Sequence, residues 1–387
     1  MLRSLSQGLV QLAPTGQAGR RGTIGETIPV PVRIHYMVGN HDWPLHLAGA
    51  SYNRLRRQIA VHLGLVTDPE GPFPHEPWES PRLLDAMRRH RVVARHGDIF
   101  DPLNYDGVRD ASSIGDAIVV ELVSRFAVQV QSELGPDLPP ATRAGLRELD
   151  SIRPLLLVPV WIDGLLERTC PSPAVRHRVK QTWDELAAEV LELPLVRRHD
   201  SWRPHGLVDG LQSALQIGRR LPVGGASSIA QWLCKLRGAA SASYAHHALA
   251  EEDFRNRRAR HIVYGHTHQP ECVPLDASFA DAFVLNQVYF NAGTWRRVYH
   301  PTQLAPGEHE FIAHETISIL AFFEGDERGG RPYETWTGTL GVNPNEAPPA
   351  HRVDAAATAA PNSAPIRAPH FTMAPAPLAA PAPTGDA

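Results

Sequence analysis

The sequence predicts an α/β fold that is interrupted by a long helical segment. Three short apolar runs each end in a polar loop, and these loops contain Asn40, His96 and His266. Polar side chains at the carboxyl ends of strands are typical of α/β sheets, in which loops converge beyond the strand ends. Between the second and third loops, about 150 residues show the apolar spacing of helices. Together these patterns favour an α/β domain with a long α-helical insert.

The first part of the chain carries two predicted strands and two predicted helices. The run VPVRIHYMV, residues 30–38, predicts a buried strand that leads into the polar loop at Gly39. Apolar residues at helical spacing predict a helix over residues 51–65 and a shorter one over residues 81–90. The second strand lies in RVVARHGDIFD, residues 91–101.

The middle of the chain is predicted to be helical, and strands return after it. Ser113 and Asp116 stand where a helix N-terminus favours such residues. Pro173 stands in the first turn of another amphipathic segment. After the helical segment, further apolar runs predict strands within residues 260–271, 282–295, 314–325 and 331–340.

The composition argues against several classes of protein. The formal net charge is −3, so nothing indicates a nucleic-acid partner. The three cysteines, Cys170, Cys234 and Cys272, form no Cys-x-x-Cys pair, which argues against a disulfide framework and a thiolate zinc site. We therefore expect a reducing, cytoplasmic compartment. No apolar run approaches the roughly 20 residues that span a bilayer, so no transmembrane segment is expected.

The two ends of the chain differ in composition from its centre. Residues 1–29 contain no acidic residue before Glu26, and we interpret them as disordered or as a misassigned start. Residues 343–387 are rich in Ala and Pro and cannot bury enough apolar surface to offset chain entropy, which predicts a disordered tail. The folded domain is therefore assigned to residues 30–342, with the helical insert at about 108–260.

The polar loops carry residues that suit divalent metal ions. The candidates are Asn40, His41 and Asp42 in the first loop, His96 and Asp98 in the second, and His266 and His268 in the third. Neutral imidazole and carboxamide oxygen are suitable ligands for Zn, Mn, Fe or Mg. A His-x-His pair on a tight loop can direct both rings toward one cavity. We therefore predict a metal site to which all three loops contribute.

The same loops resemble three of the five signature blocks of the calcineurin-like metallophosphoesterases. The blocks are GNHD from Gly39, RHGD from Arg95 and GHTH from Gly265, in the order of the family. RHGD and GHTHQP are particularly similar to the branch that contains UDP-2,3-diacylglucosamine pyrophosphatase, and NAGTWR from Asn291 resembles a later segment of that branch. The resemblance implies a two-sheet metallophosphoesterase sandwich that hydrolyses a phosphate ester or pyrophosphate with metal-activated water.

Carried over residue by residue, the resemblance implies a role for each loop. Asn40, His96 and His266 would bind one divalent metal ion and His268 the other, with Mn, Fe, Zn or Mg as the metal. His41 would act near the scissile phosphate as electrophile or general acid, with Asp42 as a supporting carboxylate. The implied substrate is a phosphorylated small molecule or a lipid-like molecule, and peripheral membrane contact is a weaker expectation.

Two blocks of the family are missing. Members begin with Asp-x-His and Gly-Asp-x-x-Asp, whereas no Asp precedes Gly39 here and the only upstream histidine is His35. The segment GDIFD has the form of the second block but follows the wrong strand, so a bridging role for Asp98 or Asp101 is an alternative. Without a bridging carboxylate, two cations would repel at short range. We expect either an N-terminally incomplete enzyme or a catalytically inactive relative that acts as a binding protein.

Simpler roles for these residues stay open at this point. His41 and Asp42 could cap a helix that begins near Trp43, and the two histidines of the third loop could be ordinary turn residues. His90 competes with His96 as the ligand of the second loop. The remaining candidates are Asn291 and Arg296 for the pocket, and Trp161, Trp183 and Trp202 for either the core or substrate contacts.

Overall fold

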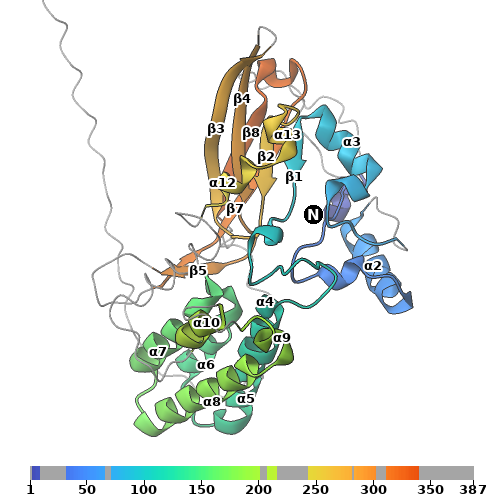
Figure 1. Ribbon diagram of the computed structural model, residues 1–387. Helices are drawn as coiled ribbons and strands as arrows, with labels where there is room; N and C mark the ends of the chain where they lie inside the picture. Colours follow the sequence, from blue (N-terminus) through green and yellow to red (C-terminus); the bar gives the residue numbers. More distant parts are fainter. Residues whose placement is uncertain are drawn as a thin grey trace, which may run out of the picture. The chain divides into compact units, whose positions relative to one another are not determined.

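The computed structural model describes residues 2–8, 32–65, 71–200, 207–215, 243–280, 283–301 and 311–339 (Figure 1). All of them belong to one unit, residues 1–340, which mixes helices and strands. Residues 2–8, expected to be disordered or foreign to the fold, contain the short helix α1 (Leu2–Ser6). The Leu5 carbonyl accepts a hydrogen bond from the Val32 N–H at 3.1 Å. The rest of the predicted N-terminal segment and the predicted tail lie outside the described residues.

A four-stranded sheet positions the second and third polar loops. Its order is β1-β2-β4-β3, in which β1 pairs with β2 and β2 with β4 in parallel, and β3 runs antiparallel to β4. The strands are β1 (Val92–Ala94), β2 (His261–Tyr264), β3 (Pro270–Ala280) and β4 (Phe283–Ala292). Because β1 and β2 are parallel neighbours, their carboxyl ends lie at the same edge, as predicted for these two strands.

Both faces of the sheet are covered. Ile262 and Tyr264 of β2 belong to a buried cluster with Tyr244 and with Ala248 of helix α12 (Ala245–Ala248). Together with α13 (Glu252–Arg255), α12 lies over β2 (Figure 1). The hairpin of β7 (Thr316–Phe322) and β8 (Tyr333–Thr339) meets the opposite face, where the ring of His261 lies 4.9 Å from that of Phe322. Successive residues of β2 therefore face different layers, as the two-residue period of a strand requires.

The strand predicted over residues 30–38 does not form in its described part, residues 32–38. Ile34 makes an isolated bridge with Leu65, and the Val38 N–H donates to the Pro74 carbonyl at 3.0 Å. The side chains become more buried along the segment, from the exposed Val32 to the fully buried Val38. A strand needs backbone pairing with a neighbouring strand, and this segment pairs with Leu65 and Pro74 instead of with β1, the edge strand of the sheet.

Helix α2 (Ala50–Leu63) and helix α3 (Pro81–Arg89) form where the sequence predicts them. Within α2, Arg56 is fully buried. Its guanidinium donates to the carbonyls of Leu45 and Leu47 at 2.8 and 2.7 Å. A buried charge is stable only with such partners, so this side chain fixes the segment that follows the Asn40 loop onto α2.

The described part of the segment between β1 and β2 is mostly helical, as predicted. Its helices are α4 (Ile114–Ala117), the π-helix η4 (Ile118–Ser124), α5 (Arg125–Leu134), α6 (Pro140–Leu146), α7 (Val158–Thr169), α8 (Pro173–Leu191), α9 (Pro194–Arg197) and α10 (Leu207–Leu215). Short 3₁₀ helices occur both within this segment and elsewhere in the chain. They are η1 (Trp43–His46), η2 (Pro77–Glu79), η3 (Asp98–Phe100), η5 (Leu149–Ser151), η6 (Leu155–Leu157) and η7 (Glu327–Gly330). None of the described helices is long and apolar enough to cross a membrane.

The tryptophans of the insert anchor its core. Trp183 is fully buried, and its ring meets that of Phe126 edge-on at 5.0 Å. Trp161 packs against Tyr299 of β5 (Val298–Pro301) and Phe311 of β6 (Phe311–His314), with ring centroids 4.8 and 5.3 Å apart. Both are therefore core residues, and Trp161 attaches the β5–β6 hairpin to the helices. Trp202 lies outside the described residues.

Replacement of His261 by Phe should stabilise the fold. His261 is buried, and neither ring nitrogen has a hydrogen-bond partner within the described part of the chain. Burial, and then the charges of Arg260 and Arg91, lower its pKa to about 3. An unsatisfied buried polar group costs about 1–3 kcal/mol. We expect His261→Phe to raise the free energy of unfolding by about 1–2 kcal/mol at pH 7, measured in urea.

The sign of the pH dependence follows from the lowered pKa of His261. Below about pH 6.5, His261 binds a proton in the unfolded chain but not in the native protein. The free energy of unfolding therefore falls as the pH drops from about 6.5 toward 3. His261→Phe should lose less stability between pH 7 and pH 5 than the native protein. The exposed His177→Phe is the control and should leave both measurements unchanged. A His261→Phe protein that is less stable at both pH values would contradict the prediction.

Candidate metal centre

Three of the residues predicted as metal ligands meet in space. The Oδ1 atom of Asn40 lies 2.9 Å from Nε2 of His96 and 3.2 Å from Nδ1 of His266. The two ring nitrogens are 3.3 Å apart, and the rings meet edge-on. Asn40 is separated from His96 by 56 residues, and His96 from His266 by 170. Segments that are remote in the sequence thus aim three ligand atoms at one point.

The sheet explains how the two histidines meet. His96 follows β1, and His266 follows the parallel neighbour β2. The Gly265 N–H donates to the His96 carbonyl at 3.0 Å, which extends the strand pairing into the loops. At Gly39, an added Cβ would lie 2.7 Å from the His96 ring. The missing side chain at Gly39 therefore lets the imidazole lie directly on the backbone beside Asn40.

Asp42 closes the Asn40 loop. Its Oδ1 accepts the Gly39 N–H at 2.6 Å, and its Oδ2 accepts the Tyr36 hydroxyl. Its backbone also precedes the 3₁₀ turn η1, but its side chain makes no capping bond to that turn. Asp42 thus stabilises the conformation of the loop that holds Asn40.

The third loop has unusual backbone angles. His266 and His268 have φ values of 35° and 62°, in the left-handed region that non-glycine residues avoid. Each such residue costs roughly 1–2 kcal/mol. Backbone strain of this kind persists where the surrounding structure fixes a side chain. Here the conformation aims His266 at Asn40 and His96, which an ordinary turn would not require.

Two outer contacts orient the ligand groups. The Asn40 Nδ2 group donates to Oδ1 of Asn104 at 2.9 Å, so the Asn40 Oδ1 atom turns toward the histidines. Oδ2 of Asp101, which is almost fully buried, lies 3.1 Å from Nε2 of His266. A carboxylate at the outer nitrogen of a histidine is the usual companion of a metal-bound imidazole. The sequence analysis missed Asn104, although it lies three residues after Asp101 in the second polar loop.

The two aspartates considered as bridging ligands have other partners. Asp101 contacts the His266 ring through one oxygen and accepts the Leu103 N–H at 3.0 Å through the other. Asp98 pairs with Arg109 at 2.8 Å. Asp101 therefore orients the His266 ring, and Asp98 neutralises the charge of Arg109.

The protonation of the histidines suits cation binding. Burial, followed by the charges of His266 and His268, lowers the pKa of His96 far below its usual value, so this ring is neutral at pH 7. Because a carboxylate only accepts hydrogen bonds, Nε2 of His266 carries the proton that points at Asp101. In the neutral ring, Nδ1 then presents a lone pair to the Asn40 oxygen. Among the three facing atoms, only Nε2 of His96 can then carry a hydrogen, which the Asn40 oxygen and Nδ1 of His266 would share. A cation would interact favourably with all three atoms.

The spacing also fits a metal ion. Nitrogen and oxygen ligands at 2.0–2.1 Å in a tetrahedral shell are roughly 3.3 Å apart. The three distances of 2.9, 3.2 and 3.3 Å are close to this value. Asn40, His96 and His266, which we call the ligand triad, therefore need only small shifts to bind a divalent ion.

His268 has a different partner from the ligand triad. Its Nδ1 atom accepts a hydrogen bond from Nε of Arg153 at 3.0 Å. Burial, and then the charge of Arg153, lower the pKa of His268 to about 3. Since an arginine only donates, the neutral His268 ring carries its proton on Nε2. To bind a metal through Nε2, His268 would have to move this proton to Nδ1 and give up the bond to Arg153. The sequence analysis missed Arg153, which belongs to the helical insert and has no motif around it.

His41 lies at the edge of the site. Its ring is exposed, and its Nδ1 atom lies 3.2 Å from Oδ1 of Asp116, while the Trp43 indole donates to the other oxygen of Asp116 at 3.1 Å. Asp116 is also part of the capping box at the start of α4. The charge of His41 contributes to the lowered pKa of His96, as expected for a ring that lies near the ligand triad.

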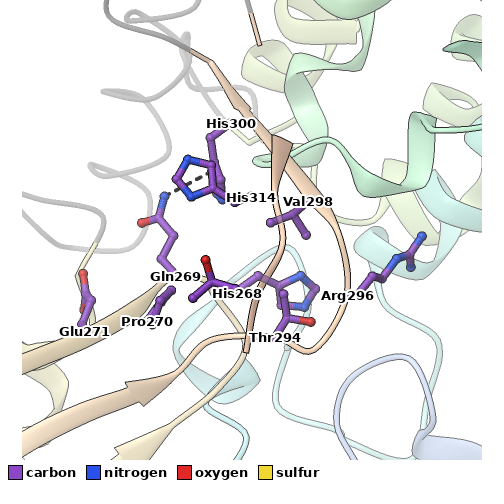
Figure 2. A pocket seen from close by; sticks show the side chains of 10 residues that line it. His268, Gln269, Pro270, Glu271, Thr294, Arg296, Val298, His300 and His314 are labelled. Carbon is purple, nitrogen blue, oxygen red and sulfur yellow. Dashed lines mark hydrogen bonds between the residues drawn. The ribbon is translucent and has the colours of Figure 1, made fainter. Parts of the chain in front are cut away.

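A cavity of about 360 Å³ opens beside His268 (Figure 2). Arg296, His300 and His314 also line it, and Gln269 turns toward His300 at 3.3 Å. Arg296 thus lines a cavity beside His268, whose lining does not include the three residues of the ligand triad. Asn291 does not line it, because it is buried in β4 between the Tyr289 hydroxyl and the Gly293 N–H.

Replacement of Gly39 by Ala should damage the ligand triad without unfolding the protein. The added Cβ would overlap the His96 ring at 2.7 Å and push it away from Asn40. We expect Gly39→Ala to bind Mn²⁺ or Zn²⁺ at this site at least tenfold more weakly, by isothermal titration, because ligand geometry controls affinity. Gly338→Ala, where an added Cβ meets no atom within 4 Å, is the control. Equal metal affinity in Gly39→Ala and the native protein would argue against the role of His96.

No family model, no curated protein and no solved structure matches this chain at a significant level. The function of the site has to be inferred from its own geometry: three ligand atoms, brought from distant segments to within 3.3 Å of one another.

Proposed function

We propose that this chain is a metal-dependent phosphoesterase with a metallophosphoesterase-type sandwich fold, and that the ligand triad binds its divalent cation. The observation that supports this most strongly is the convergence of Asn40, His96 and His266 at 2.9–3.3 Å. The order of the three polar loops along the chain agrees with the family that they resemble. A neutral His96, oriented by the backbone of Gly39, suits the role of a permanent ligand.

The ion would supply Lewis acidity and lower the pKa of a bound water molecule. The residues of the chain would do the rest. The Arg153 guanidinium stays protonated at pH 7, since burial lowers its pKa only to about 10. Through its bond to Nδ1, Arg153 fixes the His268 proton on Nε2, where the N–H can donate a hydrogen bond to a phosphate oxygen. Arg296 lines the neighbouring cavity, and its guanidinium is paired with Asp150 and donates to the Ser151 hydroxyl.

His41 is suited to the leaving-group side of the reaction. Its contact with Asp116 fixes one ring nitrogen, and its exposed ring leaves the other available for proton transfer. Proton transfer by a positioned histidine contributes typically 10²–10⁴-fold to a rate. Asp42 acts indirectly in this proposal, because it shapes the loop that carries both Asn40 and His41.

A non-catalytic binding protein is the second candidate, and one observation favours it. Within the described residues, Asp98 and Asp101 have other partners and Arg153 donates to His268, so neither a bridging carboxylate nor the His268 ring is available to a second metal ion. Two nearby cations without anionic compensation repel strongly. A single ion at the triad agrees with either candidate, and only a measurement of turnover separates them.

Removal of one triad residue should abolish turnover and release one ion per chain. We expect native protein loaded with Mn²⁺, Zn²⁺ or Fe²⁺ to hydrolyse p-nitrophenyl phosphate or bis-p-nitrophenyl phosphate. His96→Ala and Asn40→Ala should lower kcat/KM roughly 100-fold or more, because each removes a ligand. Ion content, measured by mass spectrometry of metals, should fall by one per chain in both.

The matched control is His90→Ala, which removes a half-buried histidine at the end of α3, outside the triad. It should keep both turnover and ion content. Ion loss in His96→Ala without any turnover in the native protein would support the binding-protein candidate. Unchanged ion content in His96→Ala and Asn40→Ala would eliminate both candidates.

A further inference from the structure

A second group of ligand atoms lies outside the triad. His46 ends the 3₁₀ turn η1, His75 precedes η2, and Asp110 precedes α4. Oδ1 of Asp110 lies 2.8 Å from Nδ1 of His46 and 2.9 Å from Nε2 of His75. The two imidazole rings are tilted, with centroids 4.3 Å apart. We call these three residues the loop cluster, and all three ligand atoms lie within 4.8 Å of one another.

We propose that the loop cluster binds a divalent zinc-type cation that fastens three loops together. Two imidazole nitrogens and a carboxylate oxygen form a common zinc ligand set, and the fourth position would be left to water. Tetrahedral ligands at 2.0–2.1 Å are roughly 3.3 Å apart. The present separations of 2.8 and 2.9 Å would therefore have to widen by about 0.5 Å, a small movement for side chains on loops.

Glu79 gives the loop cluster an outer partner. Its Oε2 atom accepts the His75 N–H at 2.8 Å and lies 3.6 Å from Nε2 of His46. A carboxylate beside the outer nitrogen of a histidine favours the tautomer whose inner nitrogen has a free lone pair. For His46, that inner nitrogen is Nδ1, which donates to Asp110 in the absence of an ion and would give up its proton to bind one.

Charge distinguishes the loop cluster from the ligand triad. Asp110 would bind the cation directly and Glu79 lies next to it, so two negative charges can balance a divalent ion. Arg109 lies nearby, but Glu76 and Asp98 pair with it at 2.6 and 2.8 Å. The triad has no carboxylate among its ligand atoms, and Asp101 acts on it only through the His266 ring. The loop cluster should therefore bind zinc more tightly than the triad does.

Burial differs among the members in a way that allows entry of an ion. His75 is almost fully buried, His46 is partly buried and Asp110 is exposed. The ion would reach the loop cluster from the Asp110 side, where solvent can also supply the fourth ligand. In the absence of the ion, the same carboxylate accepts hydrogen bonds from both rings, so the cluster can close without a metal.

The experiment uses the full chain with His96→Ala as background, so that the triad and the proposed function do not affect the result. Zinc is titrated into the metal-free protein by calorimetry, and cobalt is used as an optical probe of tetrahedral geometry. We expect one zinc ion per chain, and a rise in Tm on binding. Adding Asp110→Asn should weaken the affinity at least tenfold and abolish the Tm rise, although Asn keeps an oxygen that can accept hydrogen bonds.

Asp85→Asn in the same background is the matched control, because Asp85 is an exposed aspartate in a surface ion pair. It should bind zinc as the background does. If Asp110→Asn does not fold, His46→Gln replaces it and should show the same tenfold loss. Zinc binding that is absent in the background, or unchanged by Asp110→Asn or His46→Gln in a folded protein, would overturn the proposal.

Discussion

The parallel pairing of β1 with β2 is the constraint on which the candidate site depends. The register that places Val92 opposite His261 brings together two segments that are separated by the whole helical insert. The pairing continues past the strands, where the Gly265 N–H meets the His96 carbonyl. Without this ladder, the rings of His96 and His266 would have no common edge to approach. The insert is tolerated because both of its ends leave and rejoin the same sheet.

Much of the fold can be predicted from periodicity, but the first strand cannot. The helices α2, α3 and α8 and the strands β1, β2 and β4 have clear local patterns. Residues 32–38 are just as apolar, yet they form only an isolated bridge. Strand formation depends on which distant segment the backbone pairs with, and a local pattern does not specify that partner. The burial of Arg56 escapes prediction for the same reason, because its partners are carbonyls of another segment.

The candidate site was predictable only where residue type and position were both distinctive. Asn40, His96 and His266 were found from polar loops at strand ends, and the structure brings them together. His268, grouped with them in the sequence, instead accepts a hydrogen bond from Arg153, a residue with no distinctive context. Asn104 and the loop cluster are likewise defined by contacts between loops. Electrostatic partners of this kind are set by tertiary structure, whereas ligands on strand ends follow from topology.

The position of Arg153 links the scaffold to the chemistry of the site. Ile152 bridges Tyr299 of β5, and the Arg153 N–H donates to the Tyr299 carbonyl at 2.9 Å. Trp161, on the next helix, packs against the same tyrosine. The packing of the helices against the β5–β6 hairpin therefore positions Arg153, and Arg153 in turn sets the tautomer of His268. A change deep among the helices, remote from any ligand atom, could thus decide whether this imidazole offers a proton or a lone pair.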